Sequence, residues 1–170
     1  SLTGEWKENW VLTGYEWLGA KNFRDEGFDP SLTSRNGFYH WTGFIQSYFF
    51  DHRRREIYAG YEFAFDATKG QNFDQIENGF RVGLKTPLIE KFEFETDFYF
   101  QDGFYEHFNP HPKRHDLRSI YDVKLSRPVG RHWRITGFYQ FTKNNTQNDG
   151  TRGLFDYHRN IYGVEMSFNY

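Results

Sequence analysis

Apolar and polar residues alternate with a period of two along most of this chain, and this alternation predicts β-strands with one apolar and one polar face. The segment 92–101 is the clearest example: Phe92, Phe94, Thr96, Phe98 and Phe100 alternate with Glu93, Glu95, Asp97, Tyr99 and Gln101. A helix would scatter those charges around its whole circumference, so we expect a strand here. The C-terminal segment 159–170 has the same pattern and ends on the aromatic Tyr170.

The alternation predicts eight strands, each close to the ~9–11 residues that a tilted membrane strand needs. The first strand has an ambiguous phase, because two interleaved sets of residues, one starting at Trp10 and one at Val11, could each form its apolar face. We expect residues 1–9 to be an irregular start to that strand, and a short amphipathic helix on the membrane is the alternative. The predicted strands are 10–20, 38–50, 56–66, 78–88, 92–101, 117–125, 132–141 and 159–170.

The connections between these segments alternate in length. Long polar stretches follow the first, third, fifth and seventh strands, and short turns follow the second, fourth and sixth. Bacterial outer-membrane barrels have long outer loops and short periplasmic turns. The sequence therefore predicts a single domain, residues 1–170, that folds as an eight-stranded antiparallel up-and-down transmembrane β-barrel with both termini on the short-turn side.

The composition supports a membrane strand protein. Aromatic residues make up 22% of the chain, yet apolar residues make up only 37% and the mean hydropathy is -0.87. This fits strands that place half of their residues on lipid and half on a polar interior. No apolar run approaches the ~18 residues of a transmembrane helix. A net charge of -2 suggests no nucleic-acid partner, and the absence of cysteine excludes disulfides and thiol chemistry.

The strand order and the aromatic last residue resemble the small eight-stranded bacterial outer-membrane proteins of the OmpA and OmpX class. The last hairpin, from Ser126–Arg131 to the C-terminus, also resembles the final hairpin of larger exporter barrels that follow periplasmic helical-repeat domains. The first resemblance implies an integral outer-membrane monomer without a cofactor, in contact with membrane lipid and lipopolysaccharide. The second implies partner proteins of a secretion system or of the envelope. Ser1 would then be a mature N-terminus from which a signal peptide has been removed.

Charges of both signs fall on the predicted interior face. We expect them to pair, because an unpaired buried charge is very costly. Since the side chains of an eight-stranded barrel can fill its lumen, we expect a packed charge network rather than a wide pore. The residues assigned to this network are Glu56, Glu62, Arg81, Lys85, Glu93, Glu95, Asp97, Arg118, Asp122, Lys124, Arg134 and Glu165.

Many aromatic residues lie near the predicted strand ends, where they can anchor a barrel at the depth of the lipid headgroups. An aromatic saccharide site is the alternative for rings that point into the lumen, such as Tyr58 and Tyr99. The basic turn Arg53–Arg55 would lie on the periplasmic side, against phospholipid headgroups. The aromatics that we assign to the membrane interface are Trp10, Trp17, Tyr39, Trp41, Trp133, Tyr139, Phe168 and Tyr170.

Candidate chemistry is sparse. His107, His111 and His115 lie four apart in a proline-containing loop, which makes them weak metal-ligand candidates and a polar surface loop the better interpretation. Outer-membrane enzymes such as the lipid A palmitoyltransferase, the lipid A deacylase and the omptin proteases use a histidine with a serine or an aspartate. No such spacing occurs here, so we assign no catalytic residue.

These observations favour a non-enzymatic membrane role that is structural, adhesive or that of a narrow, porin-like channel. One alternative is a transport or secretion component that passes a polar or saccharide substrate. A second is a lipid A-modifying enzyme. A third is a soluble lipocalin-like carrier, in which the apolar face would point inward.

Overall fold

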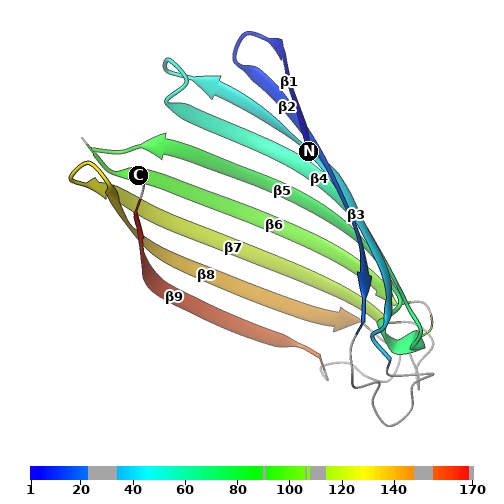
Figure 1. The fold of residues 1–170 in the computed structure, drawn as a ribbon. Helices are drawn as coiled ribbons and strands as arrows, with labels where there is room; N and C mark the ends of the chain where they lie inside the picture. Colours follow the sequence, from blue (N-terminus) through cyan, green and yellow to red (C-terminus); the bar gives the residue numbers. More distant parts are fainter. Residues whose placement is uncertain (23–33, 90, 106, 108–113, 148–154, 169–170) are drawn as a thin grey trace.

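A computed structural model of the chain describes residues 1–22, 34–89, 91–105, 107, 114–147 and 155–168. It is a nine-stranded antiparallel sheet in which every strand pairs with its neighbours in sequence order (Figure 1). No helix among the described residues is long and apolar enough to cross a membrane. The elements are β1 (Leu2–Lys7), β2 (Trp10–Lys21), β3 (Gly37–Phe50), β4 (Arg55–Thr68), the 3-10 helix η1 (Gln71–Phe73), β5 (Gln75–Pro87), β6 (Glu93–Tyr105), β7 (Arg114–Val129), β8 (Trp133–Gln147) and β9 (Tyr157–Phe168).

Two predictions about the strands are corrected. Residues 2–7 form neither an irregular start nor a helix, but a separate strand that pairs with β2 from Leu2↔Gly14 to Lys7↔Trp10. The turn between them passes through Asn9, which has a φ of 69°. The sheet therefore has nine strands rather than eight, and it places Leu2 opposite the middle of β2 instead of at the short-turn end.

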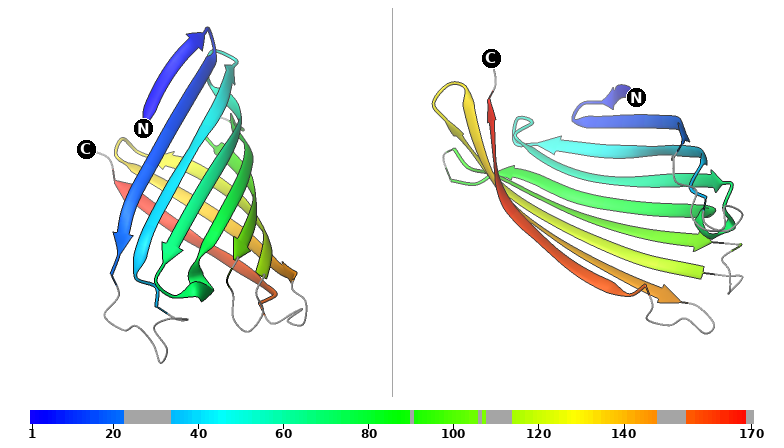
Figure 2. Two further views of the ribbon diagram at one scale, coloured as in Figure 1. Left: turned by 90° about the vertical axis from the view of Figure 1, so that its right-hand side faces the viewer. Right: turned by 60° about the horizontal axis from the view of Figure 1, so that its bottom comes forward.

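The predicted barrel is not closed in this structure. The sheet curls into an open trough, and β1 and β9 are its two edges (Figure 2). Both are odd-numbered strands of an up-and-down sheet, so they run in the same direction. Direct pairing between them would be parallel, whereas every pair in the sheet is antiparallel.

The connections alternate in length as the sequence predicts. Those after β2, β4, β6 and β8 span 22–36, 69–74, 106–113 and 148–156, and we call that edge of the sheet the long-connection end. The opposite edge, the short-turn end, has the turns at 8–9, 51–54, 88–92 and 130–132.

The two faces of the sheet differ sharply in chemistry. One row across the convex face runs through Phe44, Tyr61, Phe80 and Phe100. One row across the concave face runs through Glu62, Gly79, Gln101 and Arg118.

The exposure of the side chains is inverted relative to a water-soluble fold. Among the described residues no hydrophobic side chain is buried, and large ones on the convex face are widely exposed, such as Tyr162 at 80% and Val164 at 76%. The buried side chains of the strands are polar and lie on the concave face. They are Ser47, Glu62, Asp97, Gln101, Asp116, Ser126, Thr142, Asn144 and Thr146.

Candidate binding groove on the concave face

All twelve residues of the predicted charge network lie on the concave face, because the strand register puts them in phase with Glu62. Glu93 is the clearest junction, since Lys85 reaches it at 3.4 Å and Arg134 at 3.2 Å. Lys124 pairs with Glu95 at 3.1 Å. That this face lines a closed lumen stays a prediction.

A second group of contacts centres on Arg81. Its guanidinium lies 3.5 Å from Asp97 and 3.9 Å from Glu62, over the ring of Tyr99. The hydroxyl of Tyr58 on β4 donates to Asp97 on β6 at 2.7 Å, across the intervening strand. Contacts that skip a strand need the inward curvature of the concave face, so the curvature and this network support each other.

The remaining members of the network have weaker connections. Ser47 donates to Glu56 at 2.7 Å, Gln140 donates to Asp122 at 2.9 Å, and Arg118 donates to Gln101 at 3.2 Å. Glu165 lies exposed on the edge strand β9. The charges therefore pair best in the middle of the sheet, on β4 to β8.

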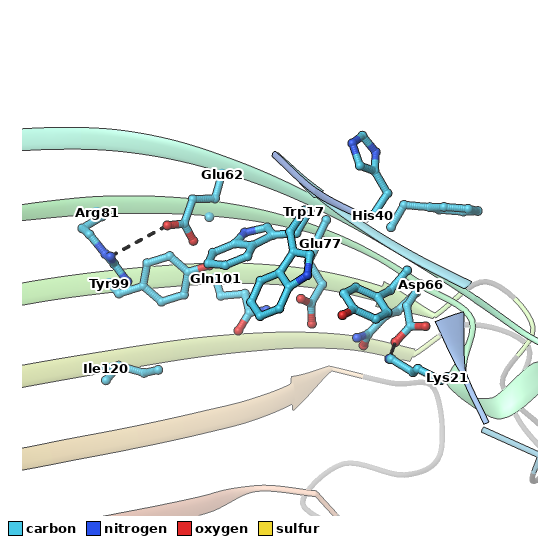
Figure 3. A pocket seen from close by; sticks show the side chains of 16 residues that line it. Trp17, Lys21, His40, Glu62, Asp66, Glu77, Arg81, Tyr99, Gln101 and Ile120 are labelled. Carbon is cyan, nitrogen blue, oxygen red and sulfur yellow. Dashed lines mark hydrogen bonds and ion pairs between the residues drawn. The ribbon is translucent and has the colours of Figure 1, made fainter. Parts of the chain in front are cut away.

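A groove of about 460 Å³ lies on this face, toward the long-connection end of β2 to β7. Figure 3 shows its side chains gathered over the strands, with Trp17, Tyr99 and the carboxylates directed into it. Most of the lining residues are aromatic, charged or amide side chains. The aromatics are Trp17, Tyr39, Trp41, Phe65 and Tyr99; the charged residues are Lys21, Glu62, Asp66, Glu77 and Arg81; the amides are Gln75 and Gln101; His40, Ala64, Gly79 and Ile120 complete the lining.

The aromatic wall comes from the neighbouring strands β2 and β3. Trp17 lies opposite Trp41 in the register, and their ring centroids are 6.4 Å apart. Tyr39 packs edge-on against Trp17 at 6.3 Å and covers Gly19. A Cβ on Gly19 would lie 2.4 Å from that ring, so the glycine is what lets Tyr39 lie flat along the sheet.

Next to the aromatic wall, β4 and β5 carry acceptors that have no donor among the described residues. Lys21 forms an ion pair with Asp66 through Oδ2, and Oδ1 of the same carboxylate is buried. Among the described residues neither this oxygen nor the buried Oε1 of Gln75 has a hydrogen-bond partner. A buried acceptor without a donor is unfavourable, so this part of the groove is suited to a ligand that brings O–H or N–H groups.

The aromatics predicted for the membrane interface divide between the two faces. Trp10, Trp133, Tyr139 and Phe168 occupy convex positions, and Trp133 packs against Phe168 at 4.8 Å. Trp17, Tyr39 and Trp41 lie on the concave face and line the groove, so a single outward belt does not contain the whole predicted set. Tyr170 lies outside the described residues. Tyr58 and Tyr99, the two proposed inward aromatics, are both on the concave face.

The histidine loop is not brought together as a site in the part that is described. His107 is exposed, and His111 lies outside the described residues. His115 is on β7 at a convex position, stacked on Phe104 at 4.3 Å and paired with Asp102. Among the described residues no group of three histidine, aspartate or glutamate side chains is arranged to hold a metal ion.

The sequence interpretation missed most of the groove. Gln75, Glu77 and Lys21 lie at strand ends, outside the expected strands 78–88 and 10–20, and Asp66 is the last residue of the expected strand 56–66. Trp17 and Trp41 are as apolar as lipid-facing residues, so their side chains alone do not indicate which face of the sheet they occupy. Gly43 is the sequence signal that could have assigned Trp41 to the concave face. It lies between Tyr15 and Glu62 in the register, and a Cβ there would lie 2.8 Å from the Tyr15 hydroxyl, so a glycine at this position marks a crowded face.

Comparison of the chain with models of protein families, with curated proteins and with solved structures found no match. The resemblance to small outer-membrane barrels therefore stays a proposal.

Proposed function

We propose that this chain is the wall of a β-barrel in a bacterial outer membrane, and that its concave face forms a passage for a hydroxyl-rich, saccharide-like substrate. The inverted exposure supports the membrane part. In the described residues the strands bury polar side chains and expose apolar ones over the convex face. Exposed apolar surface on this scale is unfavourable in water and favourable against acyl chains.

The edges of the sheet limit how such a barrel can close. In a bilayer, every backbone N–H and C=O must find a hydrogen-bond partner, so neither edge strand, β1 or β9, can stay unpaired. Since the two strands run in the same direction, an odd number of further strands between them would keep every pair antiparallel. A barrel wider than the predicted eight strands follows from that arrangement, and it leaves space above the concave face.

The groove carries the substrate part of the proposal. Trp17 and Trp41 offer apolar ring faces, while Asp66 and Gln75 offer buried acceptors without donors among the described residues. A sugar ring has an apolar face, which suits the tryptophan rings, and a rim of hydroxyl donors, which suits the buried acceptors. The groove therefore favours the transport alternative over a purely structural or adhesive role.

The enzyme and carrier alternatives fit less well. His115 and His158 occupy convex positions in the register, on the face opposite the carboxylates of the network. His40 also occupies a convex position in the register but borders the groove, and its ring lies 3.1 Å from Glu16. A lipocalin-like carrier needs apolar side chains on its concave face, where this sheet has Glu62, Arg81 and Asp97.

Oligosaccharide binding tests the groove. The refolded chain in neutral detergent is titrated with maltohexaose by calorimetry, and we expect binding that polyethylene glycol of similar size, which has no hydroxyl row, does not reproduce. Trp17→Ala combined with Trp41→Ala should weaken binding by about fivefold or more, because truncated aromatic anchors typically cost over 1 kcal/mol.

Trp133→Ala is the matched control, because Trp133 is a tryptophan on the convex face and its loss should leave maltohexaose binding unchanged. Equal weakening by Trp133→Ala would contradict the groove. So would the absence of maltohexaose binding by a folded chain.

A further inference from the structure

Five exposed arginines lie in or beside two turns of the short-turn end. Arg53, Arg54 and Arg55 come from the β3–β4 turn and its border, while Arg127 and Arg131 come from the β7–β8 hairpin. We call these five residues the basic rim. Figure 1 shows both turns at the same edge of the sheet.

The basic rim is exposed and only partly neutralised. The side chains of Arg53, Arg54 and Arg55 are 50%, 65% and 46% exposed. Arg53 pairs with Glu5 at 3.5 Å, and Asp51 is shared by Arg54 at 2.8 Å and Arg55 at 3.4 Å, so two carboxylates serve the three guanidinium groups of this turn. Arg127 lies 5.1 Å from the ring of Phe92. The rim therefore keeps excess positive charge.

Aromatic rings lie directly beside the rim on the convex face. Trp10 packs on Tyr48 at 4.8 Å, and Tyr48 stacks on Phe50 at 6.0 Å. On β8 and β9, also on the convex face, Trp133 packs on Phe168 at 4.8 Å. Such rings settle at headgroup depth in a bilayer, which places the neighbouring guanidinium groups at the level of lipid phosphates.

The long-connection end of the convex face is different. There the described strands carry carboxylate–histidine pairs, with His40 3.1 Å from Glu16 and His115 paired with Asp102. These carboxylates are paired with imidazole rings, whereas the short-turn end presents a cluster of arginines. The apolar convex band is thus bounded by two chemically distinct borders.

We propose that the basic rim binds the phosphate headgroups of anionic phospholipids in the leaflet that surrounds the short turns. A guanidinium group binds a phosphate through two parallel hydrogen bonds, and its aromatic neighbours insert into the same layer. This proposal rests on the proposed membrane location and adds a lipid preference to it.

The test compares brominated phosphatidylglycerol with brominated phosphatidylcholine as quenchers of tryptophan fluorescence in vesicles that contain the refolded chain. Trp10 and Trp133 lie beside the rim, so they report on lipid there. We expect a preference for phosphatidylglycerol of about threefold or more, which falls with added salt because the rim is exposed.

Variants locate the preference. Arg53→Gln, Arg127→Gln and Arg131→Gln combined should reduce the ratio to about one, because each cation near an anionic leaflet contributes on the order of a few-fold. The matched control removes three exposed cations near the long-connection end, Lys69→Gln, Lys143→Gln and Arg159→Gln, and should keep the preference. If the rim variant does not fold, the unaltered chain still tests the proposal: a preference for phosphatidylglycerol that does not fall with added salt would contradict it.

The outcomes separate the two proposals. Equal quenching by both lipids overturns the lipid preference and leaves the membrane location intact. Quenching by neither lipid overturns both. Loss of the preference on adding glycerol phosphate, but not sodium chloride of the same ionic strength, identifies a site for free phosphate and overturns the phospholipid assignment.

Discussion

Gly60 lies where two strands of the sheet come close together. It faces Ile45 in the register, and a Cβ there would lie 2.7 Å from the carbonyl oxygen of Phe44. A backbone atom cannot move away as a flexible side chain can, so Gly60→Ala should lower the free energy of unfolding by about 1–3 kcal/mol. Denaturant unfolding in detergent measures this difference.

Gly137 is the control for that substitution. The nearest atom to a Cβ at Gly137 is the carbonyl oxygen of Leu125 at 4.0 Å, so Gly137→Ala should be neutral or stabilise slightly. Equal losses at both positions would mean that close approach is not what requires Gly60.

The turn residue Asp51 gives a pH-dependent prediction. The hydrogen bond from Arg54, with the charges of Arg54 and Arg55, lowers the pKa of Asp51 below its ordinary value. Because the pKa is lower in the folded chain, the stabilisation is present above the unfolded value of about 3.9 and is lost as pH falls through the folded pKa. Arg54→Gln should therefore raise the pKa of Asp51.

Carbon NMR of the Asp51 carboxyl in detergent measures that pKa. Arg131→Gln, in a different turn, is the control and should leave it unchanged. An Asp51 pKa that does not respond to Arg54→Gln would contradict the assigned pairing.

For individual residues, period-two alternation predicts which charges share a face of the sheet but not which charges pair with one another. The phase of Glu93, Glu95 and Asp97 follows from their aromatic neighbours, and in the register all three lie on one face of the sheet. Which cation each carboxylate meets depends on strand curvature, as in the Tyr58–Asp97 contact across β5. Such contacts have no local sequence signal.

Strands extend further toward the long-connection end than the alternation predicts. Strand β8 was expected to end at 141, yet it continues through Gln147. Residues 143–147 contain no apolar side chain, so hydrophobic periodicity stops while backbone pairing with β7 continues. The missing start of β5 is also the part of the fold that supplies Gln75 and Glu77 to the groove.

Strand β6 provides a test of the two faces. Phe98 occupies the middle of the apolar stretch on its convex side, whereas Ile120 on the neighbouring strand faces the concave side. Phe98→Arg should lower the free energy of unfolding in vesicles by about 2–4 kcal/mol, since it puts a charge at bilayer depth.

Ile120→Arg is the comparison for Phe98→Arg and should lower the free energy of unfolding much less, because its guanidinium joins the polar side chains of the concave face. Urea unfolding followed by tryptophan fluorescence measures both. A larger loss from Ile120→Arg would reverse the assignment of the faces.

The whole molecule combines features that the sequence predicts well with two that it does not. All-β class, antiparallel up-and-down order and alternating connections follow from periodicity and turn spacing. The extra strand β1 did not follow, because its six residues, LTGEWK, alternate too weakly to be separated from β2. Closure did not follow either, since it depends on curvature and on what pairs with β1 and β9.

Site-directed spin labelling along β6 tests the central claim, that the convex face meets lipid and the concave face meets water. The chain has no cysteine, so single cysteines at 94 to 101 can each be labelled in the vesicle-inserted protein without background. We predict that accessibility to oxygen peaks at 94, 96, 98 and 100, and accessibility to a water-soluble nickel complex at 95, 97, 99 and 101. The reverse phase, or equal access to the nickel complex at all eight positions, would contradict the account.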